Sequence, residues 1–199
     1  MRVCGTLIGP FGTGTREKEN PPVHFRLTCA CDIDRIMDIL ADGRRSLAAL
    51  GIDQWQGGYP HRDVIEADVA RGDSYVVEGE DGRIMATAMV GFAGERDYDL
   101  IEGGRWLTDC LSSDPSYGVV HRVAVSSACK GCGAASLLLE NAERLVHDRG
   151  FASVRIDTHP GNVPMRRLMT KRGYTECGII YIAHAEEATP DRIAFEKLV

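Results

Sequence analysis

The chain has 199 residues, of which 44% are hydrophobic and 26% charged, and its net charge is −6 at pH 7. This length allows one domain with a full core, and the acidic balance disfavours a nucleic-acid binder, which normally carries a basic face. No apolar run is long enough to span a membrane, and the N-terminus does not read as a secretion signal. We therefore expect a cytoplasmic protein with no membrane contact.

The N-terminal third begins with residues 1–23, which combine glycines with a charged and proline-containing stretch. We expect this segment to be a flexible extension. A strand is expected over 25–30, so the folded domain occupies 24–199. Apolar residues between 33 and 40 repeat with the period of a helix, which runs on, or restarts, toward residue 50.

A second, shorter helix is expected over 61–70. Asp81-Gly82 then separates two strand-like runs, at 74–80 and 83–92, which is a strong hairpin pattern. Residues 93–116 form a long polar loop, and such loops are usually functional or mobile in a compact domain.

The second half alternates strands and helices more regularly. Its expected elements are a strand at 118–126, a helix at 134–149, a strand at 153–158, a helix at 162–172, and strands at 175–182 and 192–198. This order predicts an α/β fold with a mixed sheet.

One segment in this half has the pattern of an anion site. Residues 119–135 read VVHRVAVSSACKGCGAA, so a β-branched strand ends in a basic glycine loop that leads into a helix. Glycines let backbone N–H groups approach a phosphate, and the new helix adds the positive end of its dipole. The residues expected to bind the anion are Lys130, Gly131, Cys132, Gly133, Ala134, Ala135 and Ser136.

A second segment, from Asn162 to Tyr174, reads NVPMRRLMTKRGY. This segment and the loop, which fits Arg/Gln-x-x-Gly-x-Gly/Ala with Lys130 as its basic member, resemble the GNAT superfamily of acyl-CoA-dependent N-acetyltransferases. The resemblance covers roughly 24–199. It implies a GNAT fold, with a mixed central sheet of about six to seven strands flanked by about four helices, and acetyl-CoA as co-substrate.

The resemblance also implies roles for individual residues. The backbone of Val123 and Val125 would hydrogen-bond the pantetheine arm, and strands 118–126 and 153–158 would splay apart to admit the thioester. Asn162 would contact the cofactor, although asparagine at this position is equally suited to cap the helix, and both roles can coexist.

Two other phosphate-binding patterns fit the sequence less well. The P-loop pattern does not occur in the chain. A dinucleotide site would need glycine where Ser136 stands, although Asp157 has the position of a ribose-binding acid. Only one further strand–helix unit follows the loop, which disfavours a dinucleotide fold.

Acetyl transfer to an amine needs a group that accepts a proton. Asp157 matches the carboxylate position used in several family members. It could instead be a structural carboxylate that orders the end of the strand or pairs with Arg122 or Arg155. His121 and His159 are the candidate partners, because His159 would lie on the same side of a regular strand as Asp157. Each histidine could instead be an ordinary residue, His121 of a strand and His159 of a turn.

The general acid is the point of departure from the family. Many members carry a tyrosine where this chain has Met169, and a thioether cannot donate a proton. Either the thiolate leaves without help or another donor serves, with Tyr174 and Tyr181 as candidates. Tyr174 also suits a core position.

The acceptor pocket is expected to form from loop 51–60, loop 93–116 and the last hairpin. Its candidate lining residues are Trp55, Tyr59, Tyr98, Trp106, Asp53, Asp99, Glu102 and Asp109, although the aromatic residues could simply cover the core.

Two functions are consistent with these observations. The first is an enzyme that transfers acetyl from acetyl-CoA to a primary amine of a small molecule or peptide, by direct attack in a ternary complex. The second is a catalytically weak acyl-CoA sensor or regulatory module. A homodimer fits either.

The seven cysteines are scattered along the chain, which does not suggest a disulfide framework, and we expect free thiols. Cys29-Ala-Cys31 and Cys129-Lys-Gly-Cys132 are close pairs. A structural zinc site usually needs two pairs that each form a knuckle, so no metal site is predicted. Because Cys129 and Cys132 lie in the anion loop, their oxidation to a disulfide would distort it.

Overall fold

The computed structural model describes residues 23–183 and 188–199. The expected N-terminal extension, apart from Val23, lies outside the described residues. The strands are β1 (His24–Leu27), β2 (Ser74–Glu78), β3 (Ile84–Gly91), β4 (Tyr117–Val125), β5 (Ser153–Thr158), β6 (Thr175–Tyr181) and β7 (Asp191–Leu198). The helices are α1 (Ile33–Ala49), α2 (Arg62–Arg71), α3 (Ala134–Asp148) and α4 (Val163–Arg172). No helix in the described ranges is long and apolar enough to cross a membrane.

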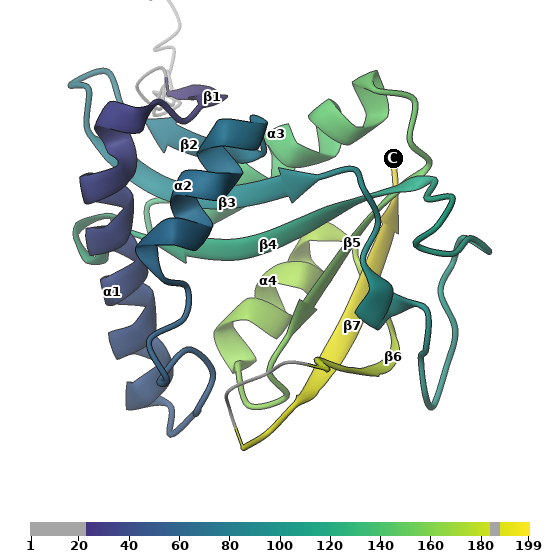
Figure 1. Ribbon diagram of the computed structural model, residues 1–199. Helices are drawn as coiled ribbons and strands as arrows, with labels where there is room; N and C mark the ends of the chain where they lie inside the picture. The colour runs from purple at the N-terminus through teal and green to yellow at the C-terminus, as the bar shows by residue number, and fades with distance from the viewer. Residues whose placement is uncertain (1–22, 184–187) are drawn as a thin grey trace, which may run out of the picture.

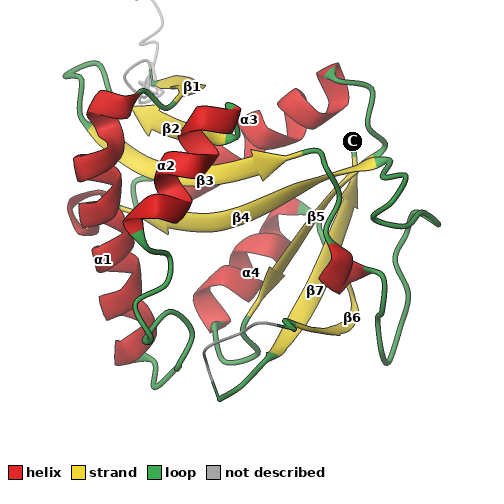
Figure 2. Ribbon diagram, in the orientation of Figure 1, coloured by secondary structure: helices red, strands yellow, loops and turns green. Residues whose placement is uncertain are grey.

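The strands form one mixed sheet in the order β1-β2-β3-β4-β5-β7-β6. Helices α1 and α2 cover one face of this sheet, and α3 and α4 cover the other (Figures 1 and 2). The seven strands and four α-helices of the described residues confirm the expected α/β fold with a mixed sheet. The predicted hairpin is also present, as β2 and β3.

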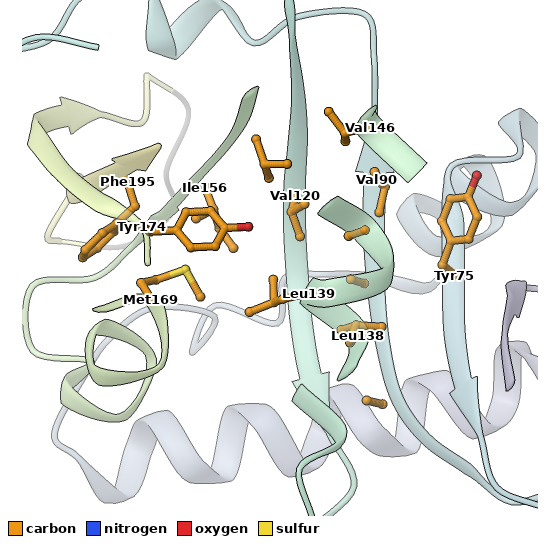
Figure 3. Packing of buried hydrophobic residues seen from close by; sticks show 14 of the residues in the cluster. Tyr75, Val90, Val120, Leu138, Leu139, Val146, Ile156, Met169, Tyr174 and Phe195 are labelled. Atoms are coloured by element: carbon orange, nitrogen blue, oxygen red, sulfur yellow. The ribbon is translucent and has the colours of Figure 1, made fainter. Parts of the chain in front are cut away.

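Apolar side chains fill the layer between the sheet and helices α3 and α4 (Figure 3). Leu138 and Leu139 of α3 are fully buried in it. Met169 and Tyr174 belong to the same cluster, with 0% and 6% of their surfaces exposed. The prediction that Tyr174 is a core residue is therefore confirmed.

The parallel strands β4 and β5 are paired over only part of their length. Their register runs from Tyr117 opposite Ser153 to Val119 opposite Arg155, and beyond these pairs the strands diverge (Figure 1). This divergence confirms the expected splaying. It leaves the second half of β4 without a hydrogen-bonded neighbour on that side in the described register.

A β-bulge interrupts β4 just beyond the point of divergence. The register with β3 shifts between Thr87 and Met89, and Arg122 has a left-handed φ of +55°. A bulge adds one residue to one strand and locally bends it. The strand expected over 118–126 is present as β4, with a bulge that the sequence pattern did not indicate.

The first cysteine pair also departs from expectation. Strand β1 ends at Leu27, and the chain turns through a short 3₁₀ helix before α1. This turn brings the Cα atoms of Cys29 and Cys31 to 5.3 Å, within the usual range for a disulfide, and the two residues are bonded. The prediction of free thiols was wrong for this pair, whereas Cys110, Cys129, Cys132 and Cys177 are free.

Candidate active site

A cavity of about 840 Å³ opens where β4 and β5 diverge. Its lining extends from the N-terminus of α3, along β4, to the loop that follows β3. The predicted site residues that line it are His121, Val123, Val125, Lys130, Gly131, Gly133, Ala134, Ala135, Ser136, Asp157 and Asn162. Cys132 and His159 are not among the lining residues.

The loop before α3 has the backbone of an anion site. Lys130 has φ −61° and ψ 133°, Gly131 has φ +79°, and the Cys132 N–H donates to the Cys129 carbonyl at 3.3 Å. These values describe a type II turn, which requires a positive φ at its third residue. Gly133 follows with φ +89° as the N-cap of α3.

Several features of this turn fit a diphosphate. A Cβ built on Gly133 would meet only open space, so the glycine serves the backbone conformation rather than close packing. Among the residues that the structure describes, no side chain caps α3, and its positive end is directed at the cavity lining. Lys130 lies at this end, with its Nζ 2.8 Å from the Ser46 hydroxyl of α1.

The N-terminus of α4 differs, because a side chain caps it. The Asn162 Oδ1 accepts from the Met165 N–H at 3.3 Å, and its Nδ2 donates to the Thr158 hydroxyl at 3.0 Å. The capping role predicted for Asn162 is confirmed. Contact between Asn162 and the cofactor stays a prediction.

At the other end of the cavity, His121 lies between two carboxylates. Its Nε2 is 3.2 Å from Glu95 Oε2, and its Nδ1 is 3.6 Å from Asp157 Oδ2. The Tyr98 hydroxyl donates to the same Asp157 oxygen at 2.8 Å. We call these four residues the cavity cluster. Arg192 Nε lies 3.9 Å from the other Asp157 oxygen, so that both oxygens have partners.

Titration shifts within the cavity cluster follow from these contacts. The hydrogen bond with His121 lowers the pKa of Glu95 below its ordinary value. Burial, followed by the nearby Asp157 charge, raises the pKa of Tyr98 well above its ordinary value. Tyr98 therefore keeps its proton and acts as a fixed donor to Asp157.

The alternative partners considered for Asp157 are engaged elsewhere. Arg122 binds Asp68 of α2 at 2.7 Å and donates to the Tyr59 hydroxyl at 2.7 Å. Arg155 binds Glu196 at 3.0 Å. A structural pairing of Asp157 with either arginine is therefore wrong.

Arg155 and Glu196 belong to a second polar group on the same face of the sheet. Both side chains are 0% exposed, and the Ser153 hydroxyl donates to Glu196 at 2.6 Å. The Arg155 guanidinium also stacks on the rings of Trp106 and Tyr117, at 4.3 and 3.9 Å from their centres. The Thr108 hydroxyl donates to Glu196 and accepts from Arg155 at 3.0 Å. We call Thr108, Ser153, Arg155 and Glu196 the dry cluster. Burial alone would raise the pKa of Glu196, but hydrogen bonds and the Arg155 charge leave it below its ordinary value.

His159 lies apart from Asp157 and beside loop 51–60. Strand β5 ends at Thr158, so the alternation that was expected to align His159 with Asp157 does not reach it. The His159 Nε2 is instead 3.5 Å from Asp53 Oδ1, and its Nδ1 accepts from the Gly161 N–H at 3.0 Å.

The acceptor side of the cavity is only partly as expected. Trp55 and Tyr59 line it, but Tyr98 is buried beneath it, and Trp106 covers Arg155. The acids expected there, Asp53, Asp99, Glu102 and Asp109, are not among its lining residues. Besides Asp157, two acids line the cavity that the sequence analysis did not identify, Glu95 and Asp97. Their position at the start of the long loop, directly after β3, was the available signal.

Neither candidate proton donor lines the cavity. Tyr174 is in the core, and the Tyr181 hydroxyl donates to Glu102 at 3.0 Å on the sheet edge. Met169, on α4, is fully buried in the core.

Comparison with known proteins agrees with this architecture. A model of the Acetyltransferase (GNAT) family matches residues 40–174. A GNAT-family acetyltransferase from Streptococcus agalactiae 2603 is 33% identical, covering 89% of this chain and 95% of that one, with a TM-score of 0.77. A comparison with curated proteins found no match.

Two more distant structures show the fold alone. A GNAT-family acetyltransferase from Listeria monocytogenes 4b F2365 is 20% identical, with 89% and 95% of the two chains covered and a TM-score of 0.64. The ribosomal-protein-S18-alanine N-acetyltransferase from Escherichia coli is 15% identical, with 89% and 94% covered and a TM-score of 0.57. With the family model and the Streptococcus structure in agreement, this chain belongs to the GNAT family of acetyltransferases.

Proposed function

We propose that this enzyme transfers the acetyl group of acetyl-CoA to a primary amine on a small molecule or peptide, by direct attack in a ternary complex. The observation that carries the proposal is the shape of one cavity. It joins the uncapped N-terminus of α3 at one end to His121 and Asp157 at the other. A cofactor with an anionic end and a reactive thioester end requires such an arrangement.

The cofactor half uses mainly backbone groups. The N–H groups between Lys130 and Ser136, with the charge of Lys130, would hold the diphosphate. The backbone of Val123 and Val125, beyond the point where β5 leaves β4, would hold the pantetheine arm in place of a neighbouring strand. Acetyl-CoA supplies the activated acyl group.

Proton uptake would fall to the pair of His121 and Asp157. As the amine attacks, it releases a proton, and an imidazole is suited to accept it near neutral pH. The imidazolium that forms at His121 is stabilised by Glu95 on one ring nitrogen and by Asp157 on the other. His159 lies against Asp53 outside the cavity lining, and we assign it no part in this step.

The thiolate would leave without a tyrosine donor. Met169 occupies the family position and is buried, and Tyr174 and Tyr181 do not line the cavity. A thiol with a pKa of about 8–9 is a tolerable leaving group without protonation.

A second function, a catalytically weak acyl-CoA sensor, is favoured by Met169 alone. The cavity cluster argues against it, because a sensor needs no histidine fixed between two carboxylates beside the acyl end.

A thiol-release assay over a panel of primary amines, together with calorimetric titration of acetyl-CoA, tests these functions. We expect acceptor-dependent release with at least one amine. The His121→Gln variant should lose about 100-fold of this rate, while its affinity for acetyl-CoA stays within twofold. Tight binding without release from any amine would favour the sensor, and absence of binding would exclude both functions.

A further inference from the structure

The loop before α3 contains two free thiols that the proposed reaction does not use. Cys129 and Cys132 are the first and last residues of the type II turn described above. The ends of a β-turn have Cα atoms less than about 7 Å apart, and most disulfides have Cα separations of about 4.4–6.8 Å. The turn therefore holds the two residues at a separation that a disulfide can bridge without unfolding α3.

The two thiols differ in access. Cys132 is exposed to solvent, whereas Cys129 is buried, with 8% of its surface exposed, and lines the cavity. Burial raises the pKa of the Cys129 thiol, and the neighbouring Cys132 thiol raises it further.

We propose that Cys129 and Cys132 form a reversible disulfide that weakens acetyl-CoA binding. The effect on binding rests on the proposed function, because it assumes that this turn holds the diphosphate. Bond formation between the two thiols rests on the turn alone.

The oxidant for this step is a low-molecular-weight disulfide. The Cys132 thiolate attacks one of its sulfurs, forms a mixed disulfide and releases one thiolate. The Cys129 thiolate then attacks the Cys132 sulfur of the mixed disulfide and releases the second. Two protein thiols are oxidised, the reagent is reduced to two thiols, and the two protons of the protein thiols pass to the released thiolates.

The disulfide would change the part of the loop that precedes the helix. Linking the sulfurs draws the exposed Cys132 toward the buried Cys129, and Gly133, the N-cap of α3, follows directly. The N–H groups that converge on the diphosphate would then lose their alignment. We expect acetyl-CoA affinity to fall at least tenfold.

The experiment treats the full chain with oxidised glutathione and then alkylates the remaining thiols. Peptide mass spectrometry should show a link between residues 129 and 132, and calorimetry should show the tenfold loss of acetyl-CoA affinity. Dithiothreitol should reverse both changes. The affinity of the Cys132→Ser variant should be the same before and after oxidation, whatever its starting value, because this variant cannot form the link. As a matched control, a Cys29→Ser/Cys31→Ser variant should respond as the wild type does.

The outcomes separate this proposal from the proposed function. If no link between 129 and 132 forms while exposed thiols are oxidised, the proposal is wrong. A complete link with unchanged affinity would also overturn it. If the untreated protein does not bind acetyl-CoA, the proposed function fails, while the mass spectrum still decides whether the turn forms the disulfide.

Discussion

The dry cluster and the cavity cluster both start from β5, only two residues apart. Arg155 and Asp157 point to the same face of the sheet, since side chains alternate along a strand. Arg155 and Glu196 are completely buried, whereas the His121 and Glu95 side chains of the cavity cluster are 20% and 32% exposed. The same face therefore holds one ion pair sealed from water and one histidine–carboxylate group open to a cavity.

This difference in exposure suits one cluster to stabilising the fold and the other to proton transfer. A fully buried charge pair exchanges no proton with a substrate, and removing one partner leaves an uncompensated charge. A partly exposed histidine with a carboxylate at each ring nitrogen can change its protonation state during a reaction. We therefore expect changes in the dry cluster to affect mainly folding, and changes in the cavity cluster to affect mainly turnover.

The largest effect is expected for Arg155→Met, which leaves Glu196 ionised and unpaired in the core. The free energy of unfolding should fall by about 3–5 kcal/mol, measured by urea denaturation. The double variant Arg155→Met/Glu196→Gln should recover a substantial part of this loss. A loss below about 1 kcal/mol in the single variant would contradict the assignment of the dry cluster to stability.

The second effect concerns Asp157→Asn. Turnover should fall by about 100-fold or more, because the neutral amide cannot help His121 to take up a proton. The affinity for acetyl-CoA should change little. The free energy of unfolding should fall by less than in Arg155→Met, because the amide loses the charge that faces Arg192 but still accepts from Tyr98. Asp148→Asn, at the exposed end of α3, is the matched control and should turn over normally. Equal turnover in both variants would remove Asp157 from the mechanism.

Tyr98 connects the two clusters, so Tyr98→Phe should have an intermediate effect. Its ring packs near Trp106 and Tyr117, and only its hydroxyl contacts Asp157. Deleting the hydroxyl should lower turnover about five- to tenfold and cost about 1 kcal/mol of stability. Steady-state kinetics and urea denaturation of the same sample would measure both. Unchanged turnover would mean that Asp157 does not need this donor.

The smallest effect is a pH dependence of the dry cluster. The pKa of Glu196 lies below its ordinary value of 4.5 in the folded protein, so its ionised form contributes stability above pH 4.5. This contribution is lost as the pH falls through the folded value. The difference in unfolding free energy between wild type and Glu196→Gln should therefore be flat from about pH 5 to 8 and shrink below pH 4.5. A difference that grows on acidification would contradict this sign.

The sequence was most informative where local rules decide the structure. Gly131 and Gly133 mark positive φ angles, and Asp81-Gly82 marks a hairpin, because few other residues adopt these conformations. Asn162 likewise identified a helix N-terminus. These elements could be predicted because each depends on a few neighbouring residues.

The site was harder to predict because it depends on contacts between distant segments. Glu95 reaches His121 only through the path of the long loop, which no local pattern specifies. The predicted orientation of His159 toward Asp157 was wrong because β5 ends at Thr158, one residue before His159. The link between Cys29 and Cys31 depends on a turn that was read as strand.

The extra residue at Arg122 has a consequence for how β4 can vary. Before the bulge, the even-numbered Val120 packs in the core beside α3, and Val119 faces the opposite side of the sheet. Beyond the bulge, the even-numbered Ala124 packs beside α1, on the other side of the sheet from Val120. The bulge therefore reverses which face of the sheet the even-numbered side chains occupy. Deleting one residue here would restore regular alternation, and every side chain of one half of the strand would move to the opposite face. Homologous enzymes aligned across this segment should accept substitutions far more readily than insertions or deletions.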